Sequence, residues 1–407
     1  MMRQVGEHLV TRGHEVTVAT SYLRERKSRS HNGVSIVEFG ATGNHVRGLR
    51  GEVDAYRRFI LQSNYDVFMV KAAQQWTFDA LWPILDEMRG PIVFVPCGFS
   101  GLFDPMYRAY FRDMRRVLSK FDHLIFYASS YRDIDFARDN GLRKYSVLPN
   151  AASEREFGVA VDHGFRTRHG IAKNAFVVLT VGTLTGGLKG HHQLAEAFAR
   201  ANFGDRPAVL ILNGNKISTV ARIREPLNAR RAFRTVRTRV RAARDRLHVT
   251  PMSRTDPLTA AVSRINEAAP GRQAVLVDLP RPEVVQAYLN SDLFVLASKI
   301  EYSPLVLFEA AAANLPFLSV PVGNAGEIAE WTGAGEICPA PRDELGYTQV
   351  DPQLLGEHIS RLASDPDHLA ELGRSGRQAW VDRFNWKVVA AQYEELFLKL
   401  IAPPRVA

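Results

Sequence analysis

The chain has 407 residues, 46% hydrophobic and 23% charged, with a formal net charge of +9 at pH 7. This length exceeds that of one ordinary core, so we expect two or three globular domains. The only two cysteines, Cys97 and Cys338, lie far apart without metal-ligand spacing, which argues against a disulfide framework or a zinc site and favours a reducing, cytoplasmic setting.

Membrane insertion is not indicated either. No apolar run approaches the roughly 18–20 residues that a transmembrane helix needs. The first residues, MMRQVGEHLVTRGHEV, lack the charged-then-apolar order of a signal peptide. We therefore expect a soluble, cytoplasmic protein that at most lies peripherally at the inner face of the membrane.

The first half of the chain begins with a predicted helix, Met1 to Arg12, and continues with apolar runs that predict strands. A doubly wound α/β domain normally begins with a strand and a glycine-rich turn instead. We therefore expect that the natural reading frame extends upstream by roughly one strand and turn, and that this first strand is missing here. The predicted strands are residues 15–20, 35–39, 66–70, 92–95, 123–128 and 145–150.

The second half repeats this pattern, which is typical of parallel sheets with helices on both faces. A polar, basic segment rich in turn formers, 151–174, marks the joint between the halves. The sequence thus predicts two doubly wound, Rossmann-like domains, residues 1–152 and 153–385. Predicted strands of the second domain are residues 175–182, 208–212, 274–279, 293–298 and 316–320.

Residues 215–272 are interpreted as a basic insertion in the second domain. The segment 216–246 holds eleven lysines and arginines against two acids, and its apolar residues recur at helical spacing. Such a helix can lie on anionic lipid or bind a polyanion such as a nucleic acid. It can also pack its apolar stripe on the domain and leave its arginines solvated. Without aromatic interleaving or a recognition-helix pattern, we expect no nucleic-acid partner.

The stretch SKIEYSPLVLFEAAAAN, residues 298–314, is the strongest candidate site. The strand before it ends at a loop, and ligands of open parallel sheets bind beyond such carboxyl ends. Backbone N–H groups from Ser303 to Val306 would be unpaired at the start of the next helix, where the macrodipole also favours an anion. Glu301 precedes this turn and Glu309 follows it. Taken singly, Glu301 is also consistent with a solvated loop residue and Glu309 with a helix-surface charge.

With its Glu-x7-Glu spacing, this stretch resembles the retaining GT-B glycosyltransferases of glycosyltransferase family 4. The resemblance extends over nearly all of the chain and implies two domains facing a cleft, with the closing helix, 386–407, packing back on the first domain. Further segments that carry the resemblance are QVGEHLVTRGHEVTVATS, SVLPNAASEREF, VGTLTGGLKGHHQLAEAFA, LPRPEVVQAYLNSDLFVLAS and FNWKVVAAQYEELF.

The resemblance also implies roles for individual residues. Glu309 would accept hydrogen bonds from ribose hydroxyls, and Glu301 would contact hydroxyls of the donor sugar. Lys189, which in isolation is also consistent with a surface loop lysine, would neutralise the diphosphate. The remaining predicted donor-site residues are Gly182, Thr183, Gly187, Ser303, Pro304, Leu305 and Val306.

Two positions depart from the family pattern. Thr183 stands where the family commonly has an arginine, which removes one positive charge from the phosphate site. Cys97 and Gly98 stand where the family usually has a histidine near the transferred sugar, so we treat both as candidates for a sugar or acceptor site. A thiol does not relay protons as an imidazole does. We favour a buried, structural Cys97 over a covalent nucleophile.

The function implied is retaining transfer of a sugar from a nucleoside-diphosphate sugar to a hydroxyl acceptor, which is a glycan, a lipid-linked molecule or a small molecule. No cofactor or metal is expected, and contact with an anionic membrane would suit a lipid-linked acceptor. Three alternatives stay open: a catalytically degenerate sugar-nucleotide-binding protein, an epimerase or phosphorylase on the same fold, and a polyanion-binding protein acting through 216–246.

Overall fold

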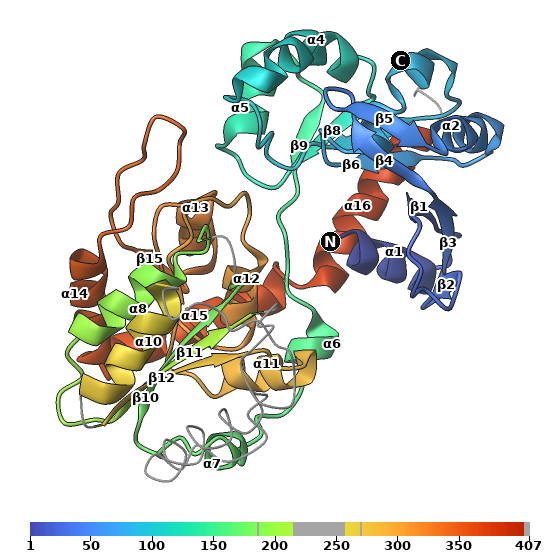
Figure 1. Cartoon of the computed structure of the whole chain (residues 1–407). Helices are drawn as coiled ribbons and strands as arrows, with labels where there is room; N and C mark the ends of the chain where they lie inside the picture. Colours follow the sequence, from blue (N-terminus) through green and yellow to red (C-terminus); the bar gives the residue numbers. More distant parts are fainter. Residues whose placement is uncertain (185–186, 215–256, 269–270, 403–407) are drawn as a thin grey trace, which may run out of the picture. The chain divides into compact units, whose positions relative to one another are not determined.

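The computed structural model describes residues 1–184, 187–214, 257–268 and 271–402. The chain forms two compact units, Met1–Ala151 with Arg383–Ala407, and Ala152–Asp382 (Figure 1). The basic segment 216–246, for which the sequence predicts a helix, lies outside the described residues. None of the described helices is long and apolar enough to cross a membrane.

The first unit contains the predicted parallel strands, arranged as two separate sheets. One sheet has the order β6-β7-β8-β9, and the other has the order β1-β3-β2, in which only β2 is antiparallel to its neighbour. The strands are β1 (Thr17–Ser21), β2 (Ser30–His31), β3 (Val34–Phe39), β6 (Phe68–Lys71), β7 (Ile92–Val95), β8 (His123–Phe126) and β9 (Tyr145–Val147).

A second feature of this unit is an antiparallel hairpin of β4 (Ala41–Asn44) and β5 (Gly48–Gly51). These glycine-rich strands were not among the predicted ones, because residues 41–51 have no strand-like apolar pattern. The helices are α1 (Met2–Thr11), α2 (Val53–Gln62), α3 (Trp76–Asp79), α4 (Arg108–Leu118), α5 (Arg132–Asp139) and α16 (Trp386–Ile401), with 3₁₀ turns at Trp82–Glu87 and Pro105–Tyr107.

Helix α16 joins the first unit from the far end of the sequence. Its Glu394 pairs with Arg12 Nε at 2.5 Å and with His14 Nε2 at 2.7 Å. Its Tyr393 is fully buried. These contacts attach α16 beside α1, and the two helices are drawn next to each other in Figure 1.

The two sheets of the first unit border a cavity of about 730 Å³. Residues of β1 line one side, residues of β6 line the other, and α1, α2 and α16 contribute apolar side chains. Within the described residues β1 and β6 are both edge strands, each paired on one side only. The cavity thus lies where one further strand would join the two sheets.

The second unit is built on one six-stranded parallel sheet in the order β12-β11-β10-β13-β14-β15. Five of its strands were predicted; the last, short one was not. The strands are β10 (Phe176–Val181), β11 (Ala208–Asn213), β12 (Arg272–Val277), β13 (Leu293–Leu296), β14 (Phe317–Ser319) and β15 (Gly335–Ile337).

Helices cover this sheet and leave its central strands buried. The described part of the expected insertion forms α10, which packs on α8 and β12 as a regular crossover helix. The helices are α6 (Glu154–Phe157), α7 (Phe165–Arg168), α8 (His191–Arg200), α10 (Pro257–Ala268), α11 (Arg281–Leu289), α12 (Leu305–Ala312), α13 (Ala325–Thr332), α14 (Pro352–Ala363) and α15 (Pro366–Asp382).

The alanine run allows α12 to pack closely against its neighbours. Ala310, Ala311 and Ala312 have no exposed surface. On α15, a Cβ added to Gly376 would lie 3.3 Å from the Ala311 Cα. Small residues on both helices therefore permit this close approach. The packing fixes the position of α12 and, with it, the end of the loop that leads into this helix.

The cavity beside β1 and β6 predicts that an added strand would stabilise the first unit. We expect a fused segment of about five Val/Ile-rich residues and a glycine-containing turn to pair with β1 and β6 and to fill the cavity. The unfolding temperature of the first unit should then rise by several degrees. Differential scanning calorimetry measures this, with a Ser/Gly segment of equal length as control. Equal unfolding temperatures for the two fusions would refute it.

Candidate functional site

Three loops converge at the carboxyl edge of the second sheet. They follow β10, β13 and β14, which are neighbours in the sheet. The Lys299 N–H donates to the Leu188 carbonyl at 2.8 Å and ties the first two loops together. The Asn324 N–H donates to the Tyr302 carbonyl at 2.9 Å and ties in the third. This edge is where ligands of parallel sheets bind.

Two glycines permit this convergence. Gly190 has a φ of 66°, and a Cβ there would lie 1.7 Å from the Ala297 carbonyl oxygen. Gly323 has a φ of 56°, and a Cβ there would lie 2.2 Å from the Tyr302 carbonyl oxygen. Both positions combine a left-handed backbone with a close approach that only glycine allows. The Gly190 contact places the adjacent Lys189 beside the loop that carries Glu301.

Lys189 and Glu301 form an ion pair. The distance from Lys189 Nζ to Glu301 Oε1 is 2.5 Å, and the side chains are 32% and 18% exposed. Their residues are 112 positions apart in the sequence. The structure therefore brings together two of the predicted site residues, an ammonium and a carboxylate, at the edge of the sheet.

Helix α12 begins directly after this loop. Pro304 occupies its N-cap position without a side-chain hydrogen bond to the helix. The first amides of an α-helix have no partner within it, and here they belong to Leu305 and Val306. Together with Ser303 they form the predicted anion-binding turn.

Glu309 lies in the second turn of α12, and its side chain is 15% exposed. Its Oε1 accepts a hydrogen bond from Arg281 Nη2 at 2.6 Å. The same guanidinium donates twice to Glu156, from Nε at 3.0 Å and from Nη2 at 2.9 Å. Burial lowers the pKa of Arg281, but Glu156 and Glu309 outweigh this effect and raise the pKa above its usual value.

Sequence reasoning missed Arg281 and Glu156 as parts of this site. Arg281 opens α11, and Glu156 lies in α6, 125 positions earlier. Each lies inside a longer segment that carries the family resemblance, and the resemblance gave neither residue a role. Only the position of Arg281 between two proline residues, 280 and 282, sets it apart in the sequence, and that pattern indicates a helix start rather than a partner.

The other predicted residues of this loop lie close by. The Gly182 N–H donates to the Asn213 carbonyl at 2.9 Å, which continues the pairing of β10 with β11. Thr183 follows and is partly exposed. Gly187 has a φ of 66° with open space where a Cβ would be.

His191 begins α8 next to this loop and is 6% exposed. Burial lowers its pKa from the usual 6.5 to about 4. The imidazole is therefore neutral at physiological pH, and it adds no positive charge to the loop that carries Lys189.

Cys97 and Gly98 belong to the first unit and lie just beyond β7. Cys97 has a φ of 62°, and the Gly98 N–H donates to the buried Asp133 Oδ2 at 2.7 Å. Burial raises the pKa of the Cys97 thiol, so the thiol stays protonated at neutral pH. This agrees with a structural cysteine better than with a nucleophile.

Comparison with known proteins connects this geometry to a family. Residues 268–379 match the model of the family described as Glycosyl transferases group 1, a range that includes Arg281, Glu301 and Glu309. Alpha-maltose-1-phosphate synthase of Mycolicibacterium smegmatis is 25% identical over 147 residues, which are 36% of this chain and 37% of that protein. The chain thus spans little more than a third of the length of that relative.

Solved structures extend the likeness to the whole fold. Sucrose-phosphate synthase from Thermosynechococcus elongatus has a TM-score of 0.67 at 17% identity, with 98% of this chain and 92% of that chain covered. Anabaena HepE, solved in complex with UDP and glucose, has a TM-score of 0.65 at 16% identity, with coverage of 98% and 95%. The predicted GT-B fold is confirmed.

The low pKa of His191 predicts a stability that depends on pH. Between pH 6.5 and about 4 the unfolded chain binds a proton at His191 that the folded chain does not, so the free energy of unfolding falls as the pH drops through this window. Relative to a His191→Gln variant, the wild type should lose roughly 3 kcal/mol from pH 7.5 to pH 4. Urea unfolding at both pH values measures this, with His192→Gln as control. Identical pH slopes for wild type and His191→Gln would contradict it.

Proposed function

We propose that the chain, whose residues 268–379 match the group 1 glycosyl transferases, transfers a sugar from a nucleoside-diphosphate sugar to a hydroxyl acceptor with retention of configuration. The Lys189–Glu301 ion pair at the start of α12 is the observation that carries the proposal. Together with the first amides of α12, this pair places a cation and a carboxylate at the edge of the sheet where ligands bind.

The chemical argument concerns the leaving group. Departure of a nucleoside diphosphate leaves negative charge on its oxygens. An ammonium and helix-end amides that are already in place stabilise this charge without rearrangement. We assign this work to Lys189 and to the amides at Ser303, Leu305 and Val306. Thr183 contributes no charge, so the glycine-rich loop would supplement Lys189 with backbone donors.

Donor binding would change the partner of Lys189. In the structure its ammonium pairs with Glu301. A diphosphate carries more negative charge than one carboxylate and would draw the ammonium toward itself. Glu301 would then accept hydrogen bonds from hydroxyls of the donor sugar. The ion pair would thus keep both side chains near their working positions before the donor arrives.

The proposed mechanism proceeds on one face of the sugar. The bond to the leaving diphosphate breaks through an oxocarbenium-like state, the acceptor oxygen attacks from the same face, and the leaving oxygen takes the acceptor proton. This sequence needs no separate general base. The protonated Cys97 is therefore no obstacle to it.

Separate observations bear on the donor and on the compartment. HepE was solved with UDP, so UDP-sugars are the first donors to test. The two free cysteines suit a reducing compartment, and we propose the cytoplasm. We propose no lipid-linked acceptor or membrane contact, because the segment 216–246 that suggested them lies outside the described residues.

The assigned role of Lys189 predicts a large loss of activity on its replacement. Lys189→Met should lower kcat for sugar transfer by about 100-fold or more, because the charge on the leaving diphosphate loses its main counter-charge. Release of nucleoside diphosphate from UDP-, GDP-, ADP- and dTDP-sugars, with a hydroxyl acceptor present, measures this. Lys173→Met, at an exposed lysine of the same unit, serves as control.

Two outcomes would contradict the proposal. Equal kcat for Lys189→Met and the control would remove the assigned role of Lys189. Tight binding of sugar nucleotides without any turnover would favour the catalytically degenerate alternative. The anomeric configuration of the product, read by nuclear magnetic resonance, would separately test retention.

A further inference from the structure

We infer that Arg281 is a positioning residue for the nucleoside end of the donor, acting through Glu309. The inference rests on the proposed function, because it deepens the role of Glu309 as an acceptor for ribose hydroxyls. Arg281 would hold one oxygen of the Glu309 carboxylate, so that the other oxygen faces the ribose.

The contacts show a cation shared by two acids. Arg281 binds Glu156 with two hydrogen bonds and Glu309 with one, at 2.6 Å. A bidentate pair fixes the plane of a guanidinium. The orientation set by Glu156 therefore determines how Nη2 meets Glu309. Glu156 is hydrogen-bonded to Arg281. Within the described residues it makes no direct contact with Glu309.

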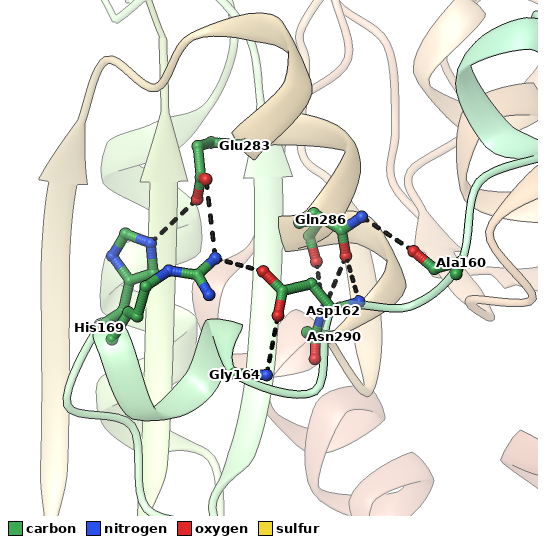
Figure 2. Close-up of polar contacts among 8 residues, drawn as sticks. Ala160, Asp162, Gly164, His169, Glu283, Gln286 and Asn290 are labelled. Atoms are coloured by element: carbon green, nitrogen blue, oxygen red, sulfur yellow. Dashed lines mark hydrogen bonds and ion pairs between the residues drawn. The ribbon is translucent and has the colours of Figure 1, made fainter.

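Further contacts anchor the backbone around the triad of Arg281, Glu156 and Glu309. Asp162 N–H donates to Gln286 Oε1 at 2.8 Å, and Gln286 Nε2 donates to the Ala160 carbonyl at 3.1 Å. Arg168 and His169 both approach Glu283, at 3.7 and 3.3 Å. Figure 2 shows these contacts joining the segment after α6 to α11. The helix that presents Arg281 is thus tied to the chain that presents Glu156.

Aromatic packing adds to this anchoring. The rings of Phe157 and Tyr288 lie 5.8 Å apart in an edge-to-face arrangement, and the Arg281 guanidinium lies 5.7 Å from the Phe157 ring. Tyr288 has no exposed surface. Burial, together with the charge of Glu309, raises the pKa of this phenol well above its usual range, so the phenol is neutral.

Stability alone is a weak reason for this triad. The side chains of Arg281 and Glu156 are 39% and 36% exposed, and ion pairs at such exposure contribute about 0–1 kcal/mol. Glu309, in contrast, is 15% exposed and carries its charge at the edge of the sheet. A cation that keeps this carboxylate oriented has its clearest use when a hydroxyl ligand must be bound.

A competing explanation is that Arg281 itself binds the ligand, for example a phosphate oxygen. The two explanations differ in their dependence on ribose. If Arg281 acts through Glu309, its removal matters only when ribose hydroxyls are present. If it binds phosphate, its removal weakens every nucleoside diphosphate equally.

Calorimetric titration of the full chain separates these explanations. The probes are UDP, GDP and ADP, each beside its 2′,3′-dideoxy counterpart. Arg281→Met should weaken the preferred ribonucleoside diphosphate roughly tenfold and leave the dideoxy counterpart unchanged. Glu309→Gln should show the same preference, and the double variant should bind no more weakly than Glu309→Gln alone.

Two further variants test whether a loss of binding comes from general destabilisation of the protein. Glu156→Gln leaves Arg281 in place but removes its anchor, so it should cause a smaller loss with the same ribose dependence. Arg374→Met, at an exposed arginine of α15, should change nothing. Circular dichroism and unfolding temperature report whether each variant folds.

The outcomes distinguish this inference from the proposed function. Equal losses for ribose and dideoxy ligands, or additive effects of Arg281→Met and Glu309→Gln, would overturn the positioning role while leaving nucleotide binding intact. Failure of the wild type to bind any of the probes would overturn the proposed function and this inference with it.

Discussion

The whole site depends on one close contact, the approach of Gly190 to the Ala297 carbonyl at the carboxyl ends of β10 and β13. A side chain at position 190 would overlap the oxygen at 1.7 Å. Because this position carries no side chain, the two loops touch, and Lys189 meets Glu301 across them. The same two loops lead into α8 and α12, so one steric condition brings together a cation, a carboxylate and two helix starts.

Both acids of the Glu-x7-Glu pair are held by a basic side chain. Glu301 pairs with Lys189, and Glu309 pairs with Arg281. Each carboxylate therefore has an opposite charge in direct contact, which fixes the orientation of its side chain. In the proposed function, a donor would exchange partners with side chains that are already oriented, rather than order them from free rotation.

Much of the fold was predictable because it depends on local patterns. Apolar runs specified eleven strands correctly, and the helix 386–401 was evident from its sequence. The hairpin of β4 and β5 was missed because its residues, ATGN and GLRG, have no strand-like apolar pattern. Of the site, the sequence indicated the loop, Lys189 and both glutamates. Arg281 and Glu156 were missed, because no sequence pattern connects these two residues and their contact exists only in the folded chain.

The account is tested most directly by a crystal structure of the protein with UDP, or with whichever nucleoside diphosphate binds best. It predicts a diphosphate between Lys189 Nζ and the first amides of α12, with Lys189 moved away from Glu301 and a ribose hydroxyl on Glu309. A nucleotide bound elsewhere, with the Lys189–Glu301 pair intact, would contradict it.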